Sequence, residues 1–450
     1  MFLYPVRHKT VRRVSRVARA KSNRYIRIVK PRKSRARALL LLVLCAVPAF
    51  AQLTAEQKQL NLASFEAVWS AIHERHWEEK PAGLDWQVIH QEYRPQVEGA
   101  TSTEAARAVM RDMLGRLKQT HFAIFPAAVY QVLDPSGAGD GWPGFEAHVL
   151  NGRVIVTETL NSDSVKQGWE VLQANGADLP PLVTKLQADP AVHELQLERA
   201  VAARLSGPIA TVRPMVFADA AGVRVTRDIK LIPPRGNFAG FGNLPPQPVW
   251  FESKQLGNTG YIRFNMFLDL VHVMTEFGNA VQKCAHCDGI VIDLRGNPGG
   301  IGGMAMGMAG WLLSQQGQRL GTMYMRGATL SFAINPRAGA YGGPLAVLVD
   351  GSSASTAEIF AGGLKDLGRA RIFGTRTAAA ALPSVITRLP NGDGFQYAIA
   401  NYISEGGQAL EGNGVIPDVE VKLTREALLA GHDAVLDAAL DWIRKQKESK

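Results

Sequence analysis

Residues 350–358 read D-G-S-S-A-S-T-A-E and place three serines between an apolar run and an amphipathic segment. The run at 345–350 predicts a buried strand and residues 356–367 predict a helix, so Ser355 stands at a helix N-terminus. Unpaired backbone N–H groups and the helix dipole can stabilise a developing oxyanion there, which suits a serine nucleophile. The same letters form a capping box from Ser355 to Glu358, a structural alternative that needs no catalysis.

A glycine-rich loop, D-L-R-G-N-P-G-G at residues 293–300, follows a second apolar strand pattern. Its glycines leave the backbone free to present N–H groups to an anion. A phosphate-binding loop is one alternative, but no G-K-S/T and no G-x-G-x-x-G stands in register before the next helix. The loop therefore favours an oxyanion cradle, and a plain glycine turn stays open for Gly302 and Gly303.

A serine nucleophile also needs a base, which can be a histidine, a lysine or an N-terminal amine. His121 lies in K-Q-T-H-F-A-I-F-P, an apolar segment after a helical pattern. His73, His76 and His90 lie in a charged helical region and are predicted to be surface residues. Taken by itself, His121 indicates a hydrogen-bonded structural histidine, and its role as a base needs further support.

The regions of the chain that must position these residues differ in their patterns of apolar and polar residues. Residues 52–128 have apolar positions at helical spacing, and residues 139–235 carry short β-type runs, so we expect a helical domain and a small β-rich domain. Residues 233–248 are rich in Pro, Gly and Asn and predict a linker. Strands and helices then alternate through residues 245–425, before a C-terminal helix at 426–450. The alternation predicts an α/β core with its site at the carboxyl ends of parallel strands, in a multidomain α+β protein.

Residues 1–51 hold 14 Lys and Arg and no Asp or Glu, and they end in an apolar run of 14 residues from Ala38, with small residues at Ala49 and Ala51. This pattern predicts a signal peptide cleaved after Ala51, with an uncleaved anchor as the alternative. The remaining chain has 36 basic and 40 acidic residues, so the net charge of +10 does not indicate a nucleic-acid partner. We expect a secreted or periplasmic protein of the bacterial envelope, with no stable membrane span after cleavage.

Two cysteines, Cys284 and Cys287, lie in C-A-H-C between a helical pattern and a strand. A thioredoxin-like motif would instead open a helix, and two thiolates with His286 fall short of a closed zinc site. The pair is therefore interpreted as structural, and whether it forms a disulfide stays open.

Together these motifs resemble the carboxyl-terminal processing peptidases, also called tail-specific proteases, and the tricorn core protease. The resemblance covers nearly all of residues 55–445, and four motifs carry it: T-G-Y-I-R-F at 259–264, G-I-V-I-D-L-R-G-N-P-G-G at 289–300, L-V-D-G-S-S-A-S-T-A-E-I-F-A-G-G-L-K-D at 348–366, and L-E-G-N-G-V-I-P-D-V-E-V at 410–421.

The resemblance implies that Ser355 is the nucleophile of a serine peptidase. Tail-specific proteases take their base from a lysine, but Ala380 stands at that position here, and Lys365 is out of register. The tricorn-like branch uses a histidine after a hydroxyl residue, with a distant glutamate. The residues that match these roles are His121, Thr120 and Glu411. The implied oxyanion hole is made by backbone N–H groups of Gly299, Gly300 and Thr356.

The chain departs from the family pattern at Gln119, at Phe122 and in the alanine-rich stretch 378–381. The β-rich region resembles a PDZ module, with a tight turn at Asn175 and Gly176. For the α/β region, the resemblance to the peptidase family implies a crotonase-like (ClpP-like) core.

We expect an exported serine endopeptidase that cleaves polypeptides near their C-terminal tails through an acyl-enzyme on Ser355, with no metal or organic cofactor. An inactive peptide- or lipophile-binding protein of the same fold is the alternative, and an esterase is a third.

Overall fold

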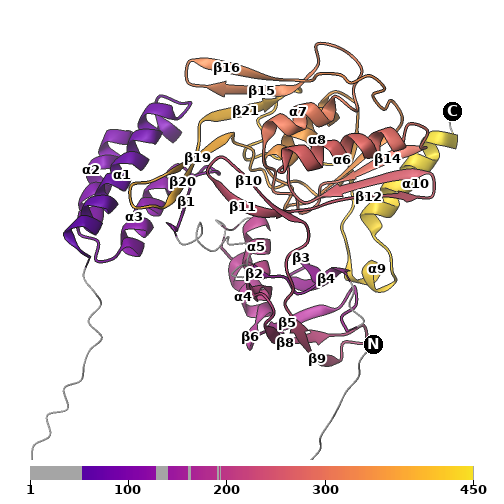
Figure 1. Cartoon of the computed structure of the whole chain (residues 1–450), viewed down its shortest axis with the longest axis horizontal. Coiled ribbons are helices and arrows are strands. Elements are labelled where there is room, and N and C mark those ends of the chain that lie inside the picture. Colours follow the sequence, from indigo (N-terminus) through magenta and orange to yellow (C-terminus); the bar gives the residue numbers. More distant parts are fainter. Residues whose placement is uncertain (1–52, 128–139, 161–163, 190–191, 193, 449–450) are drawn as a thin grey trace, which may run out of the picture. The chain divides into compact units, whose positions relative to one another are not determined.

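The computed structural model describes the chain except for residues 1–52, 128–139, 161–163, 190–191, 193 and 449–450 (Figure 1). The predicted leader of residues 1–51 lies outside the described residues. Within the described part, no helix combines the length and the apolar character needed to cross a membrane.

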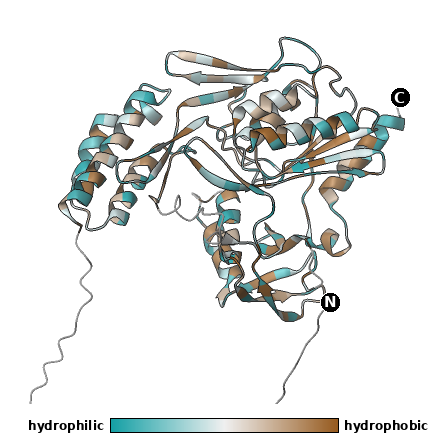
Figure 2. Cartoon of the chain, viewed as in Figure 1, coloured by the Kyte–Doolittle hydropathy of each residue, from teal (hydrophilic) through white to brown (hydrophobic). Residues whose placement is uncertain are grey.

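The N-terminal region is helical, as predicted. Its elements are α1 (Ala55–Arg75), the 3-10 turn η1 (Pro81–Gly83), α2 (Trp86–Glu98) and α3 (Thr103–Gly115). Each α-helix begins after a residue whose side chain accepts a hydrogen bond from the first turn: Thr54, Asp85 and Ser102. Figure 2 shows hydrophobic and hydrophilic residues alternating along these helices, and their apolar faces share one core.

This helical core is completed by strands from distant parts of the chain. They form a sheet in the order β1 (Ala123–Phe125), β20 (Gly394–Ala398) and β19 (Ser384–Arg388), all antiparallel. Two buried side chains, Arg107 of α3 and Asp393 before β20, are joined by hydrogen bonds of 2.9 and 3.0 Å. The pair joins α3, which precedes the segment that contains His121, to the turn before β20.

The middle region is rich in β-strands, as predicted, and it also contains two helices. Its elements are β2 (Asp140–Gly141), β3 (Phe145–Leu150), β4 (Arg153–Thr159), β5 (Glu170–Ala174), β6 (Ala177–Asp178), α4 (Leu179–Gln187), α5 (Glu194–Leu205), β7 (Gly207–Pro208), β8 (Val212–Ala218) and β9 (Arg224–Lys230). The main sheet runs β3-β4-β5-β8-β9, so β3 is an edge strand. Asn175 and Gly176, with φ of 48° and 80°, form the predicted tight turn between β5 and β6.

The predicted linker at 233–248 is wrong, because most of it forms an antiparallel hairpin of β10 (Asn237–Phe241) and β11 (Leu244–Val249). Prolines disfavour a strand in the middle of a sheet since they lack a donor, but a strand paired on one side tolerates them. Each strand of this two-stranded hairpin is paired on one side only, so the hairpin can contain the prolines that suggested a linker.

The predicted alternation of strands and helices is confirmed in the core. A six-stranded sheet has the order β12 (Phe251–Leu256), β13 (Thr259–Phe264), β14 (Gly289–Asp293), β17 (Leu345–Val349), β18 (Arg371–Gly374) and β22 (Val419–Glu420). All neighbours in it are parallel except β12 and β13. One face packs against α6 (Leu270–Lys283), α7 (Gly302–Ala309) and α8 (Thr356–Asp366).

The other face of this sheet is covered by α10 (Ala434–Glu448), which follows the short helix α9 (Arg425–Leu429) (Figure 1). A smaller antiparallel sheet, in the order β16 (Ala328–Ala333), β15 (Arg319–Met325) and β21 (Ala400–Ser404), contacts α8. The predicted glycine-rich and serine-rich loops follow β14 and β17, which are adjacent parallel strands. Both loops therefore lie at the carboxyl ends of the strands, on the same side of the sheet.

Candidate active site

Ser355 lies at the sharp turn between β17 and α8, where its backbone has φ 54° and ψ −119°. A non-glycine residue in this conformation carries strain of about 1–3 kcal/mol, which the surrounding structure must hold in place. Ser355 is half-buried, whereas every other residue from Gly351 to Phe360 is buried. This strained strand-to-helix turn has the mechanics of a nucleophile elbow, which presents one side chain outward.

The turn before Ser355 is held by the carboxylate of Asp350. This carboxylate accepts 3.0 Å hydrogen bonds from the N–H groups of Ser352, Ser353 and Gly296. Gly296 belongs to the glycine-rich loop, so a single side chain ties the two loops of the candidate site together. Asp350 was not among the predicted site residues, although an aspartate that precedes a turn is a frequent acceptor for backbone N–H groups.

The capping interaction is present alongside this geometry. Glu358 is fully buried, and its carboxylate accepts a 3.0 Å hydrogen bond from the Ser355 N–H group. The same carboxylate accepts from Thr377 Oγ1 at 2.5 Å and from the N–H groups of Ala379 and Ala380 at 2.9 and 3.0 Å. Burial raises the pKa of Glu358 to about 7, against these hydrogen bonds, which lower it.

The glycine-rich loop presses against the turn of Ser355. Gly299 has φ of 92°, and a Cβ atom there would lie 2.7 Å from Ala354 O and from Thr356 N. Only glycine fits at this position, because both the backbone angle and the space exclude a side chain. The Thr356 hydroxyl donates a 2.8 Å hydrogen bond to Gly300 O, which closes the contact from the other side.

The predicted oxyanion donors are not equivalent. The N–H group of Gly299 already donates to Asn297 Oδ1 at 2.9 Å. Gly300 is exposed, and its N–H group makes no hydrogen bond within the described residues. Thr356 is the first residue of α8, where backbone N–H groups have no partner inside the helix. Gly300 and Thr356 thus have N–H groups available for an oxyanion, and Gly299 shapes the loop.

The predicted histidine network is assembled by contacts across the chain. Thr120 Oγ1 donates to Glu411 Oε2 at 2.9 Å, and the Thr120 N–H group donates to Glu411 Oε1 at 2.8 Å. Thr120 Oγ1 also lies 2.7 Å from His121 Nδ1. The hydroxyl has one proton, and an ionised carboxylate can only accept, so the imidazole must donate from Nδ1. This tautomer leaves Nε2 of His121 as the acceptor nitrogen.

One peptide group connects this network to Ser355. Ala380 O accepts from the Ser355 N–H group at 2.8 Å, and the adjacent Ala381 N–H group donates to Glu411 Oε2 at 3.1 Å. The carbonyl and the N–H belong to the same planar amide, so Ser355 and Glu411 lie on its two sides. No hydrogen bond within the described residues joins the Ser355 hydroxyl directly to the His121 ring. Catalytic hydrogen bonds are often long before substrate binds.

The electrostatic surroundings favour a neutral imidazole. Burial and the positive charge of Arg199 on α5 lower the pKa of His121 to about 4. Lys365, the lysine nearest in sequence to the missing base, donates to Ile416 O at 2.6 Å and pairs with Asp418 at 3.1 Å. It is therefore engaged away from Ser355, in agreement with its register.

A cluster of titratable side chains from the middle region lies next to the two loops, and none of its members was predicted to belong to the site. It lines a cavity of about 620 Å³ at the carboxyl ends of the parallel strands. His148 Nδ1 lies 3.5 Å from Glu198 Oε2, and Glu194 packs against Gly351. Burial and the charges of Asp350 and Glu198 raise the pKa of Glu194 to about 7.

The same carboxylates act on the histidine of this cluster. Burial lowers the pKa of His148, but Glu198, Asp350 and Glu146 outweigh burial and raise it to about 9.

The prediction that His73, His76 and His90 lie on the surface is wrong for His76, which is fully buried.

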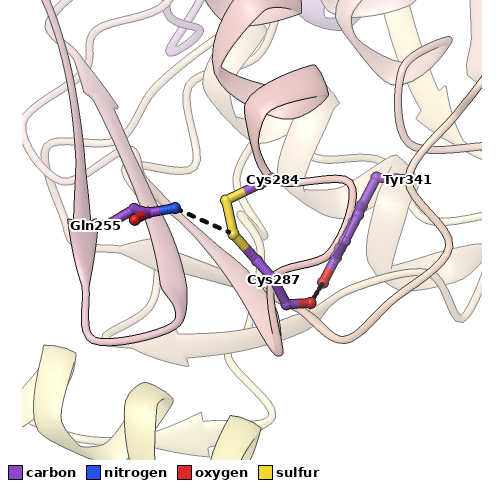
Figure 3. The surroundings of a disulfide bond; sticks show 4 residues. All are labelled: Gln255, Cys284, Cys287 and Tyr341. Carbon is purple, nitrogen blue, oxygen red and sulfur yellow. Dashed lines mark hydrogen bonds between the residues drawn. A yellow bond between two sulfur atoms is a disulfide. The ribbon is translucent and has the colours of Figure 1, made fainter.

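Cys284 and Cys287 form a disulfide at the end of α6, with Tyr341 donating a hydrogen bond to Cys287 O (Figure 3). The structural interpretation of this pair is consistent with its place between helix and strand. Within the described residues, no group of His, Cys, Asp and Glu side chains could hold a metal ion.

Comparison with known proteins finds similarity to peptidases. Residues 258–421 match the family described as peptidase family S41, and residues 61–115 match the tricorn protease C1 domain. The chain is 26% identical to the carboxyl-terminal-processing protease of Synechocystis sp. over 420 residues, and this alignment covers 90% of each protein. It is 25% identical to the chloroplastic carboxyl-terminal-processing peptidase 3 of Arabidopsis thaliana, over 78% of this chain and 67% of that protein.

Two solved structures share the fold. The photosystem II D1 C-terminal processing protease is 20% identical, with a TM-score of 0.54 over 85% of this chain and 99% of that one. Mature CPAF is 15% identical, with a TM-score of 0.57 over 87% of this chain and 97% of that one.

Proposed function

We propose, from the premise that the chain carries a domain of peptidase family S41 and is a serine-type peptidase, that it cleaves polypeptides near their C-terminal tails through an acyl-enzyme on Ser355. The observation that carries the proposal is the hydrogen-bonded series Glu411, Thr120 and His121, linked to Ser355 by the peptide group between Ala380 and Ala381. The absence of a lysine at Ala380 supports the histidine branch of the family.

In the acylation step, Ser355 Oγ attacks the carbonyl carbon of the scissile amide while its proton passes to His121 Nε2. A new O–C bond forms, and the negative charge on the carbonyl oxygen is received by the N–H groups of Gly300 and Thr356. Collapse of this intermediate breaks the C–N bond, and His121 gives its proton to the leaving amine. The acyl group stays on Ser355.

In the second step, His121 takes a proton from a water molecule, which attacks the ester. The bond between Ser355 Oγ and the acyl carbon breaks, and the serine regains its proton. Thr120 and Glu411 keep Nδ1 of the imidazole as a donor throughout, so Nε2 faces the reacting atoms in both steps. The low pKa of His121 favours the neutral base over a wide pH range.

The middle region supports a PDZ-like role in substrate capture. Its edge strand β3 is paired with a strand on one side only and lies beside α5, and such an edge next to a helix suits β-augmentation by a peptide tail. We further propose a crotonase-like core and export of the protein, the latter on the basic and apolar leader of residues 1–51.

A fluorophosphonate probe and tail peptides test the proposed function. The probe should label the wild type but neither Ser355→Ala nor a heat-unfolded sample, and peptides with a free C-terminus should be cut faster than C-terminally amidated ones. A wild type that is neither labelled nor active on any peptide would contradict the proposal. That outcome would return the balance to the binding-protein alternative, which the family match does not favour. Turnover of nitrophenyl esters without peptide cleavage would indicate the esterase.

A further inference from the structure

The buried histidine His76 is the C-cap of α1, and its N–H group donates to Ile72 O. None of its side chain is exposed, although the segment around it is highly charged. A buried imidazole is retained where both of its nitrogens find partners, because an unpaired polar group in the interior is costly.

Both ring nitrogens of His76 are satisfied. Nδ1 accepts a 3.1 Å hydrogen bond from the Glu78 N–H group, so the ring proton must be on Nε2. Nε2 therefore donates to Gln119 Oε1 at 3.0 Å. Burial lowers the pKa of His76, and the nearby charges of Glu78 and Arg326 act on it in opposite directions. The ring is held neutral and in a single tautomer.

The faces of the His76 ring are also occupied. The Trp77 ring stacks on it with centroids 3.9 Å apart and an interplanar angle of 21°. The Phe122 ring lies nearly parallel to it at 6.0 Å, with an angle of 18°. His76 thus contacts Gln119 by a hydrogen bond and Phe122 by stacking, and these two residues flank Thr120 and His121.

The segment between these two contacts needs such support. His121 has φ of 62°, a conformation that non-glycine residues seldom adopt and that costs about 1–3 kcal/mol. The segment follows the end of α3, and His121 itself lies outside any helix or strand. Two hydrogen bonds from Thr120 to Glu411 hold this segment, and the contacts of the residues on either side of Thr120 and His121 add to them.

We propose that His76 is a positioning residue of the peptidase, which holds Gln119 and Phe122 and thereby directs His121 Nε2 toward Ser355. The proposal rests on the proposed function, since it assigns a role around the same base.

The proposal also accounts for two departures from the family pattern. A glutamine at 119 accepts from a neutral imidazole without adding a charge to a buried site. A carboxylate at that position would favour a proton on His76, and the cationic ring could no longer accept from the Glu78 N–H group. An aromatic ring at 122 supplies the stacking partner. Gln119 and Phe122 are thus matched to one histidine.

A double-mutant cycle tests this role. His76→Phe keeps a ring between Trp77 and Phe122 but removes the donor, and Gln119→Met removes the acceptor at similar volume. We expect each variant to lower kcat on the order of tenfold or more, with KM changed less than twofold, and the double variant to be no worse than the poorer single one. Ile89→Val, a buried change on α2, is the control for lost stability and should lower Tm while leaving kcat unchanged.

A second readout does not need activity. The ¹⁵N resonance of His121 Nε2 in the folded protein should shift or broaden in His76→Phe and Gln119→Met, but not in Ile89→Val. If His76→Phe fails to fold, Gln119→Met alone carries the test.

The role is refuted if folded His76→Phe and Gln119→Met keep kcat within twofold of the wild type, if their effects add, or if the His121 resonance is unmoved. A wild type without any turnover or labelling would instead refute the proposed function, and the resonance would still decide the positioning role.

Discussion

The hydroxyl of Thr120 joins the Glu411 carboxylate to the His121 ring, and Thr120→Val removes it with little change of shape. The wild-type hydroxyl donates to Glu411 Oε2 at 2.9 Å and accepts from His121 Nδ1 at 2.7 Å. Valine retains the backbone N–H group that donates to Glu411 Oε1, so the fold of the segment should survive.

The expected size follows from the two lost hydrogen bonds. The bond to the carboxylate contributes about 1.5–3 kcal/mol and the bond to the imidazole about 1 kcal/mol. The imidazole gains positive charge in the transition state, so both bonds strengthen there and their loss falls on kcat. At about 1.4 kcal/mol for each factor of ten, Thr120→Val should lower kcat by a factor on the order of 10²–10³.

The assay is steady-state cleavage of a tail peptide, combined with the rate of fluorophosphonate labelling of Ser355. Thr120→Ser keeps the hydroxyl and should retain kcat within a few-fold of the wild type. KM should change little in both variants because Thr120 is not proposed to touch the substrate. The reasoning fails if Thr120→Val, folded and with normal Tm, labels and turns over as fast as Thr120→Ser.

Three further perturbations test other parts of the site. Gly299→Ala places a Cβ atom 2.7 Å from Ala354 O at φ 92°, so kcat should fall at least tenfold and Tm should drop, as turnover and thermal unfolding would reveal. Arg199→Gln removes the cation that helps to hold the pKa of His121 near 4; the acid limb of the kcat/KM profile should therefore move to higher pH, and an unmoved limb would count against this electrostatic reading. Burial and neighbouring carboxylates raise the pKa of Glu194 to about 7 from an ordinary 4.5, so its contribution to stability is complete below pH 4.5 and is lost as pH rises through 7. Glu194→Gln should flatten the fall of Tm across that window, and an identical pH dependence of Tm in wild type and variant would argue against the assignment.

The elements of the core were accessible from the sequence because they follow strong local patterns. Apolar runs ending in aspartate or glycine gave β14 and β17, and the glycine-rich and serine-rich letters after them marked the loops at the sheet edge. Ser355 could be located by its place between a buried strand and a helix. That His121 belongs to the same network as Ser355 could not be predicted from local patterns, since 234 positions separate the two residues. Only the family resemblance pointed to it.

Contacts to backbone N–H groups could be predicted only in part from the sequence. Asp350 ties two loops through N–H groups, and Glu358 gathers N–H groups of Ala379 and Ala380. A backbone donor is offered by every residue except proline, so no residue type marks such a partner. His76 was misplaced for a related reason: its neighbours are charged, but its burial is set by Gln119 and Phe122, more than 40 residues away.

The alanine-rich stretch gains a different meaning from these contacts. In the sequence it stood as a departure from the family pattern, with alanines where relatives carry glycines and with Ala380 in place of the lysine. In the structure its backbone is what matters: Ala380 O holds the Ser355 N–H group, and Ala381 N–H holds Glu411. The small alanine side chains let residues 378–381 lie between Ser355 and Glu411 without displacing either residue. In the proposed mechanism His121 takes the place of the missing lysine, and the peptide group between Ala380 and Ala381 links its network to Ser355.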